Sequence, residues 1–236
     1  MKSKGLIITV IVILIIAGIG VGVYFLGQSV GTDLKQEQLL IEEISTLSAL
    51  NPEEDDYNTP IKTEGVYAEI ETTIKEYLAS YANSTQKASK LMTQMQESNL
   101  LTNENYKQDG PEFTQSLETI KSLRTQFNEE MDNLINLSTV ETINKKGEEK
   151  NWDNRFFELY KTCMLDSEIE ADLEQSKEQL EEAKTAVNDT LDQQEKILTF
   201  LKDNKDDWQV SDSGKLEFNT QEILDQYAAL VTVIEE

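Results

Sequence analysis

The segment Gly5–Gly27 contains no charged residue. An α-helix rises about 1.5 Å per residue, so a helix of this length spans about 35 Å, enough to cross the hydrocarbon core of a bilayer. Lys2 and Lys4 precede the segment, and the next charged residue is Asp33. The positive-inside rule therefore predicts an N-terminus in the cytoplasm and the bulk of the chain outside it. The predicted parts are a basic tail at 1–4, a transmembrane anchor at 5–27 and an exported domain at 28–236.

A cleavable signal peptide is the main alternative to this anchor. Residues 6–16 would make an apolar signal region, and Gly18-Ile19-Gly20 resembles a cleavage site of small residues. However, apolar residues continue to Leu26, so cleavage would leave an apolar new N-terminus. No cysteine follows the segment, which argues against a bacterial lipoprotein. We therefore expect a retained, single-pass anchor in the cell membrane, and both interpretations predict an exported domain.

Gly18 and Gly22 are four residues apart within the predicted anchor. This G-x-x-x-G spacing lets the backbones of two membrane helices approach closely. Glycine is also frequent in membrane helices without such a role. The pair is a candidate contact between transmembrane helices, with a chance spacing as the alternative.

The rest of the chain is strongly acidic. The full sequence has 21 basic and 45 acidic residues and a net charge of −24. Lys2 and Lys4 lie before the anchor, so 19 basic and 45 acidic residues remain, a net charge of −26. This charge repels phosphate backbones, so we expect no nucleic-acid partner. The negative charge is compatible with solvated helix faces, and also with binding of cations or of a basic protein partner.

Residues 64–98 carry the clearest helical pattern. Apolar and small residues recur every seven positions from Tyr67, and a second row begins three residues later at Ile70, as in a heptad repeat. Further amphipathic patterns, interrupted by only three prolines, predict an all-α fold: an elongated antiparallel bundle of long helices. The other predicted helices cover residues 33–50, 112–137, 152–204 with a break near Asp166, and 220–236. Polar stretches at 99–111 and 144–150 predict loops.

The heptad stripe within residues 152–204 is interrupted by Ser176, Thr190 and Gln194, so it forms a weak seam. Such seams usually pack against other helices of the same chain, and a homo-oligomeric coiled coil is the alternative. Tyr67, Tyr77 and Tyr81 lie on the two rows of residues 64–98 and are expected in the core. They could instead line a groove for a small cationic ligand, which aromatic rings and acids attract.

The sequence period changes at residues 207–218. Trp208 and Val210 alternate with polar residues, a turn sequence follows, and Leu216 and Phe218 alternate again. This pattern predicts a small β-hairpin. Because two strands alone are marginally stable, Trp208 and Phe218 should pack against the helices. A functional contact at the hairpin is the alternative, since loops often carry function.

The chain lacks several side chains that catalysis and metal binding commonly use. It has no histidine, and its one cysteine is Cys163. A general base of the commonest type and a Cys/His zinc site are therefore missing. No phosphate loop, dinucleotide fingerprint or nucleophile elbow occurs. A paired-carboxylate glycosidase would need a deep aromatic cleft, which thin bundles rarely supply.

We therefore predict a protein that is not an enzyme, with no catalytic residue, metal or cofactor. The consecutive acids Glu53, Glu54, Asp55 and Asp56 lack the spaced ligands of a calcium loop and are expected to be solvated. Cys163 has apolar neighbours and is expected to be a buried, unreactive thiol, with a reactive or intermolecular cysteine as the alternative.

The sequence favours an extracytoplasmic scaffold or accessory subunit of the cell envelope. It would bind the bilayer through residues 5–27 and a protein partner through the exported domain. The alternative function is a helical sensor or solute-binding domain for a small ligand, for which a cation would suit the acidic charge.

Overall fold

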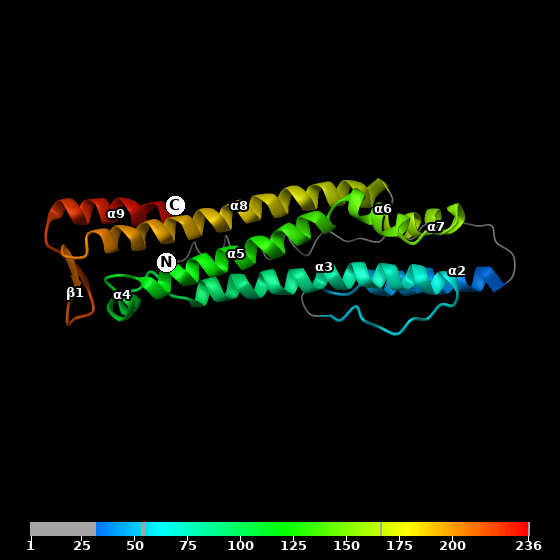
Figure 1. Cartoon of the computed structure of the whole chain (residues 1–236), viewed down its shortest axis with the longest axis horizontal. Helices are drawn as coiled ribbons and strands as arrows, with labels where there is room; N and C mark the ends of the chain where they lie inside the picture. Colours follow the sequence, from blue (N-terminus) through cyan, green and yellow to red (C-terminus); the bar gives the residue numbers. More distant parts are fainter. Residues whose placement is uncertain (1–31, 53–54, 166, 236) are drawn as a thin grey trace. The chain divides into compact units, whose positions relative to one another are not determined.

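A computed structural model describes residues 32–52, 55–165 and 167–235 (Figure 1). These residues form eight helices and one two-stranded antiparallel hairpin, which confirms the predicted helical class and the C-terminal hairpin. The elements are α2 (Thr32–Ser48), α3 (Val66–Glu97), α4 (Asn103–Asp109), α5 (Thr114–Leu137), α6 (Val140–Glu148), α7 (Asn154–Met164), α8 (Ser167–Asp203), β1 (Trp208–Val210), β2 (Leu216–Phe218) and α9 (Gln221–Glu235).

The described residues divide into two compact units. The α2 unit comprises residues 32–52, 55–89, 130–165 and 167–181, and the hairpin unit comprises 90–129 and 182–235. Helices α3, α5 and α8 contribute residues to both units.

The heptad rows of α3 supply much of the core of the α2 unit. Buried apolar side chains of α2 and α5 belong to this core as well, because each helix keeps one apolar stripe away from water. The buried apolar side chains of α2, α3 and α5 in this core include Leu40, Ile44, Leu47, Ile70, Ile74, Tyr77, Tyr81, Leu134 and Leu137. The Tyr67 ring also makes an edge-on contact with Phe156 of α7, at 5.3 Å between ring centres.

Two stretches predicted as loops contain helices. Helix α6 covers most of residues 144–150, where Gly147 suggested a turn. A Cβ added to Gly147 would lie 2.7 Å from the Tyr160 ring, so this glycine instead permits close packing of α7 on α6. The Thr139 side chain accepts a hydrogen bond from the Thr142 N–H and caps the helix start.

Helix α4 lies inside the predicted loop 99–111. Thr102 caps it by accepting a hydrogen bond from the Asn105 N–H at 3.2 Å. Tyr106 is buried and makes edge-on ring contacts with Phe113 and Trp208, at 5.7 and 6.3 Å. This helix is too short to be stable alone, so these tertiary contacts explain why its polar sequence folds as a helix.

The predicted break near Asp166 is present. Helix α7 ends at Met164, where the Leu165 N–H still bonds to the Lys161 carbonyl, and α8 begins at Ser167.

The β-hairpin pairs Trp208 with Phe218 and Val210 with Leu216. Gly214 adopts a positive φ of 77° in the turn, a conformation that glycine reaches without strain. The Trp208 ring stacks on Phe113 with 5.7 Å between centres, and its indole N–H donates to the Leu201 carbonyl at 2.6 Å. The expected packing of Trp208 against the helices is therefore observed.

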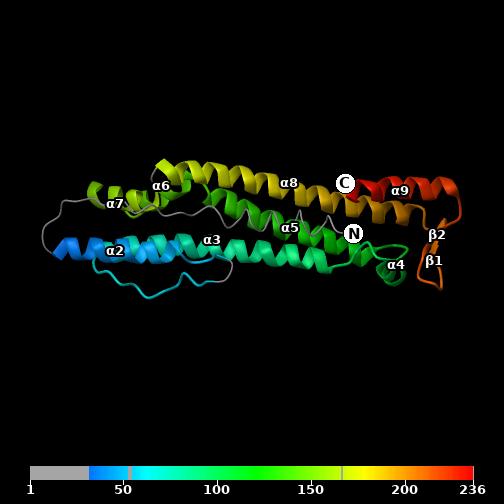
Figure 2. The same ribbon diagram turned by 180° about the vertical axis from the view of Figure 1, so that it is seen from behind.

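Helix α9 follows the hairpin and lies beside the C-terminal part of α8 in both views (Figures 1 and 2). The Gln193 side chain of α8 donates to the Leu230 carbonyl of α9 at 2.6 Å. The Phe218 and Tyr227 rings lie 5.0 Å apart and join β2 to α9.

Candidate functional site

The predicted anchor 5–27, with Gly18 and Gly22, lies outside the described residues. Of the helices in the described part of the chain, none is both long and apolar enough to cross a membrane. The helix contact at Gly18 and Gly22 therefore stays a prediction from sequence.

A buried cluster of charges lies in the α2 unit. Glu43 of α2 and Glu71 of α3 are 2% and 0% exposed, and Lys75 of α3 is 5% exposed. The Lys75 ammonium lies 2.6 Å from a Glu71 carboxylate oxygen and 2.8 Å from one of Glu43. Lys62, whose side chain is half exposed, contacts the second carboxylate oxygen of Glu43. Two carboxylates and two ammonium groups thus balance in charge, as buried ions require.

This cluster holds the loop at residues 55–65 against α2 and α3. The Lys75 ammonium also donates to the carbonyls of Pro60 and Thr59, at 2.9 and 3.3 Å. The Glu71 carboxylate accepts from the backbone N–H groups of Lys62 and Thr63. Charged side chains thereby take the place of a helix or sheet as hydrogen-bond partners of the loop backbone.

Hydrogen bonding also determines the pKa of both acids. Burial alone would raise the pKa of Glu71, but bonds from Lys75, Thr63 and the loop backbone outweigh it and lower the pKa. In Glu43, burial likewise opposes contacts from Lys62 and Lys75, and the net pKa is again lowered. Both carboxylates are therefore held in the charged form, which suits a structural role better than that of a proton donor.

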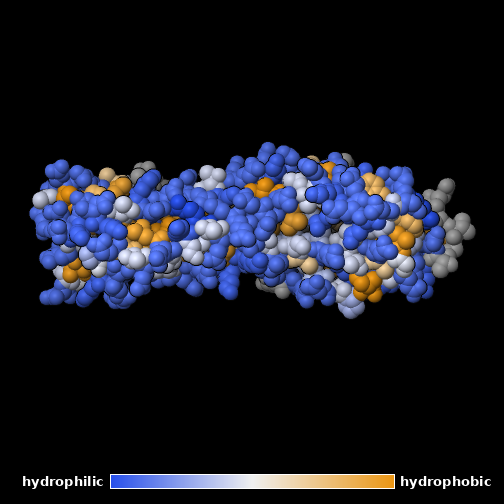
Figure 3. Space-filling view, in the orientation of Figure 1, coloured by the Kyte–Doolittle hydropathy of each residue, from blue (hydrophilic) through white to orange (hydrophobic). Residues whose placement is uncertain are grey.

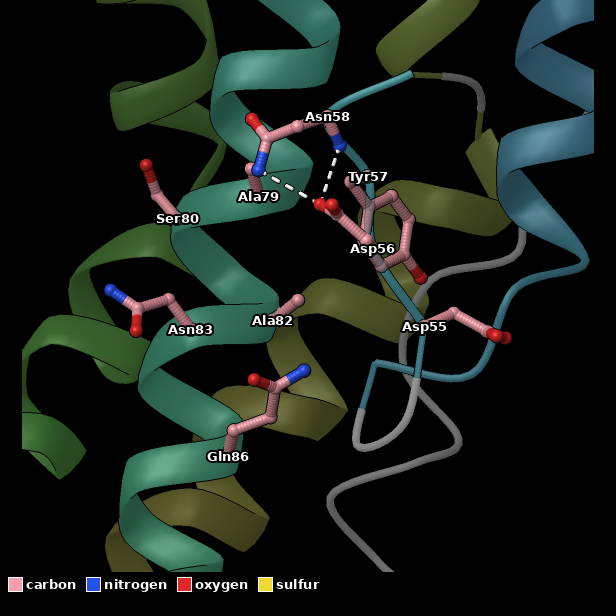
Figure 4. A pocket seen from close by; sticks show the side chains of 9 residues that line it. All are labelled: Asp55, Asp56, Tyr57, Asn58, Ala79, Ser80, Ala82, Asn83 and Gln86. Carbon is pink, nitrogen blue, oxygen red and sulfur yellow. Dashed lines mark hydrogen bonds between the residues drawn. The ribbon is translucent and has the colours of Figure 1, made fainter.

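A pocket of about 500 Å³ opens between this loop and α3 (Figure 4). Its lining residues are Asp55, Asp56, Tyr57, Asn58, Ala79, Ser80, Ala82, Asn83 and Gln86. One oxygen of the Asp56 carboxylate accepts from the backbone and side-chain nitrogens of Asn58, both at 2.8 Å. One oxygen of Asp55 accepts from the Asn51 N–H at 2.7 Å. Among the described residues that line the pocket there is no basic side chain.

Of the four consecutive acids, the structure describes only Asp55 and Asp56, because Glu53 and Glu54 lie outside the described residues. In the described part of the chain, no group of three or more acidic or cysteine side chains is placed to hold a metal ion.

The predicted tyrosine stripe lies in the core. Tyr67, Tyr77 and Tyr81 are at most 4% exposed. The Tyr77 hydroxyl donates to the Leu137 carbonyl at 2.6 Å, and the Arg155 guanidinium donates to the Tyr67 hydroxyl at 3.2 Å. These tyrosines do not line the pocket beside Asp56, whose aromatic residue is Tyr57.

Cys163 is buried in α7, and burial raises the pKa of its thiol to about 12. A thiol with this pKa is almost wholly protonated at neutral pH and reacts slowly. The structure thus favours the expected buried, unreactive cysteine.

The hairpin and α9 expose apolar side chains in the hairpin unit. Trp208 and Phe218 are half buried, so each still has surface exposed. In α9, none of the described side chains at 221–232 is buried, although its sequence is more apolar than that of the other long helices. Leu224 is 40% exposed.

Sequence reasoning does not predict two features described above, namely the burial of a charged pair and the exposure of α9. Glu71 and Lys75 are spaced as an ordinary exposed i, i+4 pair, so no local signal indicates their burial. The exposure of α9 was also not anticipated, although the absence of lysine and arginine from residues 216–236 could have indicated a distinct surface.

Comparison with known proteins finds no matching family, no matching curated protein and no matching solved structure.

Proposed function

We propose that the protein is a membrane-anchored extracytoplasmic scaffold or accessory subunit that acts through protein contacts in the cell envelope. The charge-free segment 5–27, preceded by two lysines, supports the anchor and its orientation. The remaining acidic helical domain supports a role in binding.

The observation that carries the proposed binding role is the exposure of α9. An apolar helix normally buries one face completely, yet α9 has no buried side chain over its described positions 221–232. Exposed apolar surface bordered by polar residues is typical of an interaction site. The surface formed by the hairpin and α9 is therefore the proposed contact surface.

Membrane topology gives the first test. Ser213 is exposed in the hairpin turn and can be changed to cysteine in a Cys163→Ala background. We expect Ser213→Cys to react with a membrane-impermeant maleimide in intact cells and to remain in the membrane fraction after carbonate washing. Labelling that requires cell lysis would contradict the extracytoplasmic placement. The Cys163→Ala parent controls for background labelling.

Photo-crosslinking tests the binding role itself. A photoreactive amino acid at Leu224 should crosslink the protein to a specific partner in native membranes. The matched control position is Leu34 of α2, which is 44% exposed against 40% for Leu224. If neither position yields a crosslinked protein, the scaffold function is wrong.

A second candidate function is the binding of a small cationic solute. The pocket beside Asp55 and Asp56 favours it, because its lining combines carboxylates with amide and hydroxyl groups. A polyamine such as spermidine should then raise the melting temperature of the full-length protein, and a neutral polyol should not. Asp56→Asn should reduce the polyamine effect, whereas Asp212→Asn in the hairpin turn should leave it unchanged.

A further inference from the structure

The inner face of α9 is defined by its contacts with the hairpin unit. Ile223, Tyr227 and Leu230 are half buried and recur at helical spacing. The Tyr227 ring meets Phe218, and the Leu230 carbonyl accepts from Gln193. These contacts fix the side of α9 that is already covered.

A second apolar row lies beside this covered face. Leu224, Ala228 and Val231 are spaced i, i+4 and i+7, so they share one side of the helix. Leu224 is 40% exposed, Ala228 is exposed and Val231 is half buried. We call these residues the α9 strip. Figure 3 shows hydrophobic atoms among hydrophilic ones over α9.

The charged residues of α9 itself are all acidic. Asp225 is exposed, lies three residues before Ala228 at the edge of the strip, and accepts a hydrogen bond from Gln221. Glu222 is also exposed and accepts one from Gln226, but it lies about half a helical turn away from Leu224. Between residues 216 and 236 the sequence has no lysine or arginine. Its acids there are Glu217, Glu222, Asp225, Glu235 and Glu236.

We propose that the α9 strip docks a basic amphipathic helix of a partner protein, an inference that rests on the proposed scaffold function. Apolar residues of the partner would cover Leu224, Ala228 and Val231, and a lysine or arginine of the partner would face Asp225, which borders the strip beside Ala228. Charge complementarity selects this occupant. A second copy of the chain would bring acids against acids, at a net charge of −24 per chain, and an anionic lipid surface would be repelled as well.

The test uses the full-length protein in phosphatidylcholine nanodiscs and three labelled synthetic peptides. The first is an amphipathic helix of leucine and lysine, the second has the same composition in an order without an apolar face, and the third replaces lysine with glutamate. Fluorescence anisotropy, corrected for empty nanodiscs, should show saturable binding of the first peptide only. Its affinity should fall as salt is raised, because salt screens exposed charges.

Leu224→Asp should weaken binding of the first peptide by about tenfold or more, since it places a charge in the apolar contact. Leu34→Asp changes a leucine of similar exposure in the α2 unit and should leave the affinity unchanged. Circular dichroism verifies that both variants fold as the parent does. Equal binding of the scrambled peptide, or an unchanged affinity in Leu224→Asp, would overturn the proposal.

Light scattering tests for a second copy in the same samples. A dimer that Leu224→Asp dissociates would overturn the assignment to a basic partner. The crosslinking test separates the two levels of inference. A partner captured at Leu34 but not at Leu224 would contradict only the docking role of the α9 strip. Capture at neither position would contradict the scaffold function itself.

Discussion

The Lys75 ammonium lies 2.6 Å from the Glu71 carboxylate, one turn earlier on α3, and both side chains are buried. On an exposed helix this spacing stabilises by only a few tenths of a kcal/mol. Here Glu43 forms a second ion pair with Lys75, and the backbone of residues 59–63 forms hydrogen bonds with both Lys75 and Glu71. The pair therefore connects α2, α3 and a loop that has no regular secondary structure of its own.

Removing Lys75 should destabilise the fold strongly. Lys75→Met leaves the Glu43 and Glu71 carboxylates without their shared cation, and breaking a buried ion pair typically costs about 3–5 kcal/mol. Urea unfolding followed by circular dichroism measures this free energy. Lys90→Met, on the same helix but exposed, is the matched control and should change it little. If the two variants lowered the free energy of unfolding equally, the buried cluster would contribute no more to stability than an exposed lysine does.

Stability should depend on pH through the same acids. The pKa of Glu43 and of Glu71 is lowered from its ordinary value of 4.5, so the unfolded chain binds protons more readily than the folded one. Their contribution is therefore complete above about pH 4.5 to 5.5 and is lost as the pH falls through the lower folded pKa. The difference in unfolding free energy between the parent and Glu71→Gln should be constant near neutrality and narrow below pH 4.5. A difference that widens on acidification would contradict this.

The tyrosine hydroxyls should resist ionisation in the folded protein. Burial raises the pKa of the tyrosines at positions 57, 67, 77, 81, 106, 160 and 227. Alkaline titration by ultraviolet absorbance should therefore show less phenolate near pH 10 in the folded protein than in the unfolded chain. The same titration in urea should give a midpoint near the ordinary value of about 10. The same midpoint near pH 10 in the folded protein and in urea would refute the burial of these rings.

The Tyr77 hydroxyl should contribute more to stability than that of Tyr67. Tyr77→Phe leaves the buried Leu137 carbonyl without its donor, a loss of about 1–3 kcal/mol. Tyr67→Phe removes a hydroxyl that pairs with Arg155, whose side chain is 51% exposed and can turn to water. Urea unfolding of the two variants compares these losses, and the reverse order would contradict the geometry.

Cys163 should react with thiol reagents only after unfolding. Its buried thiol, with a pKa raised to about 12, offers almost no thiolate at neutral pH. The rate of maleimide labelling should therefore follow the unfolded fraction as urea is increased. Ser213→Cys provides an exposed thiol in the same chain and should react at once without urea.

The pattern of residues predicted much of the helical framework. The heptad rows predicted α3 because they require one buried stripe, and the break near Asp166 and the alternation at 207–218 also correspond to observed features. Helices α4 and α6 were not predicted, because Gly147 and the polar run around Tyr106 resemble loop signals. Contacts with Tyr160, Phe113 and Trp208, which lie outside those two segments, outweigh the local preferences.

The sequence by itself determined the apolar charge-free segment, the acidic charge and the helical period, since these depend only on the order of residue types. Only the tertiary structure decided that Glu71 and Lys75 are buried, because the loop before α3 folds back over them and Glu43 of α2 packs against Lys75. It likewise decided that Leu224 is exposed, because the apolar residues of α9 look alike in sequence. Hydrophobic periodicity specifies that a helix has an apolar face, whereas burial depends on which other segments pack against that face.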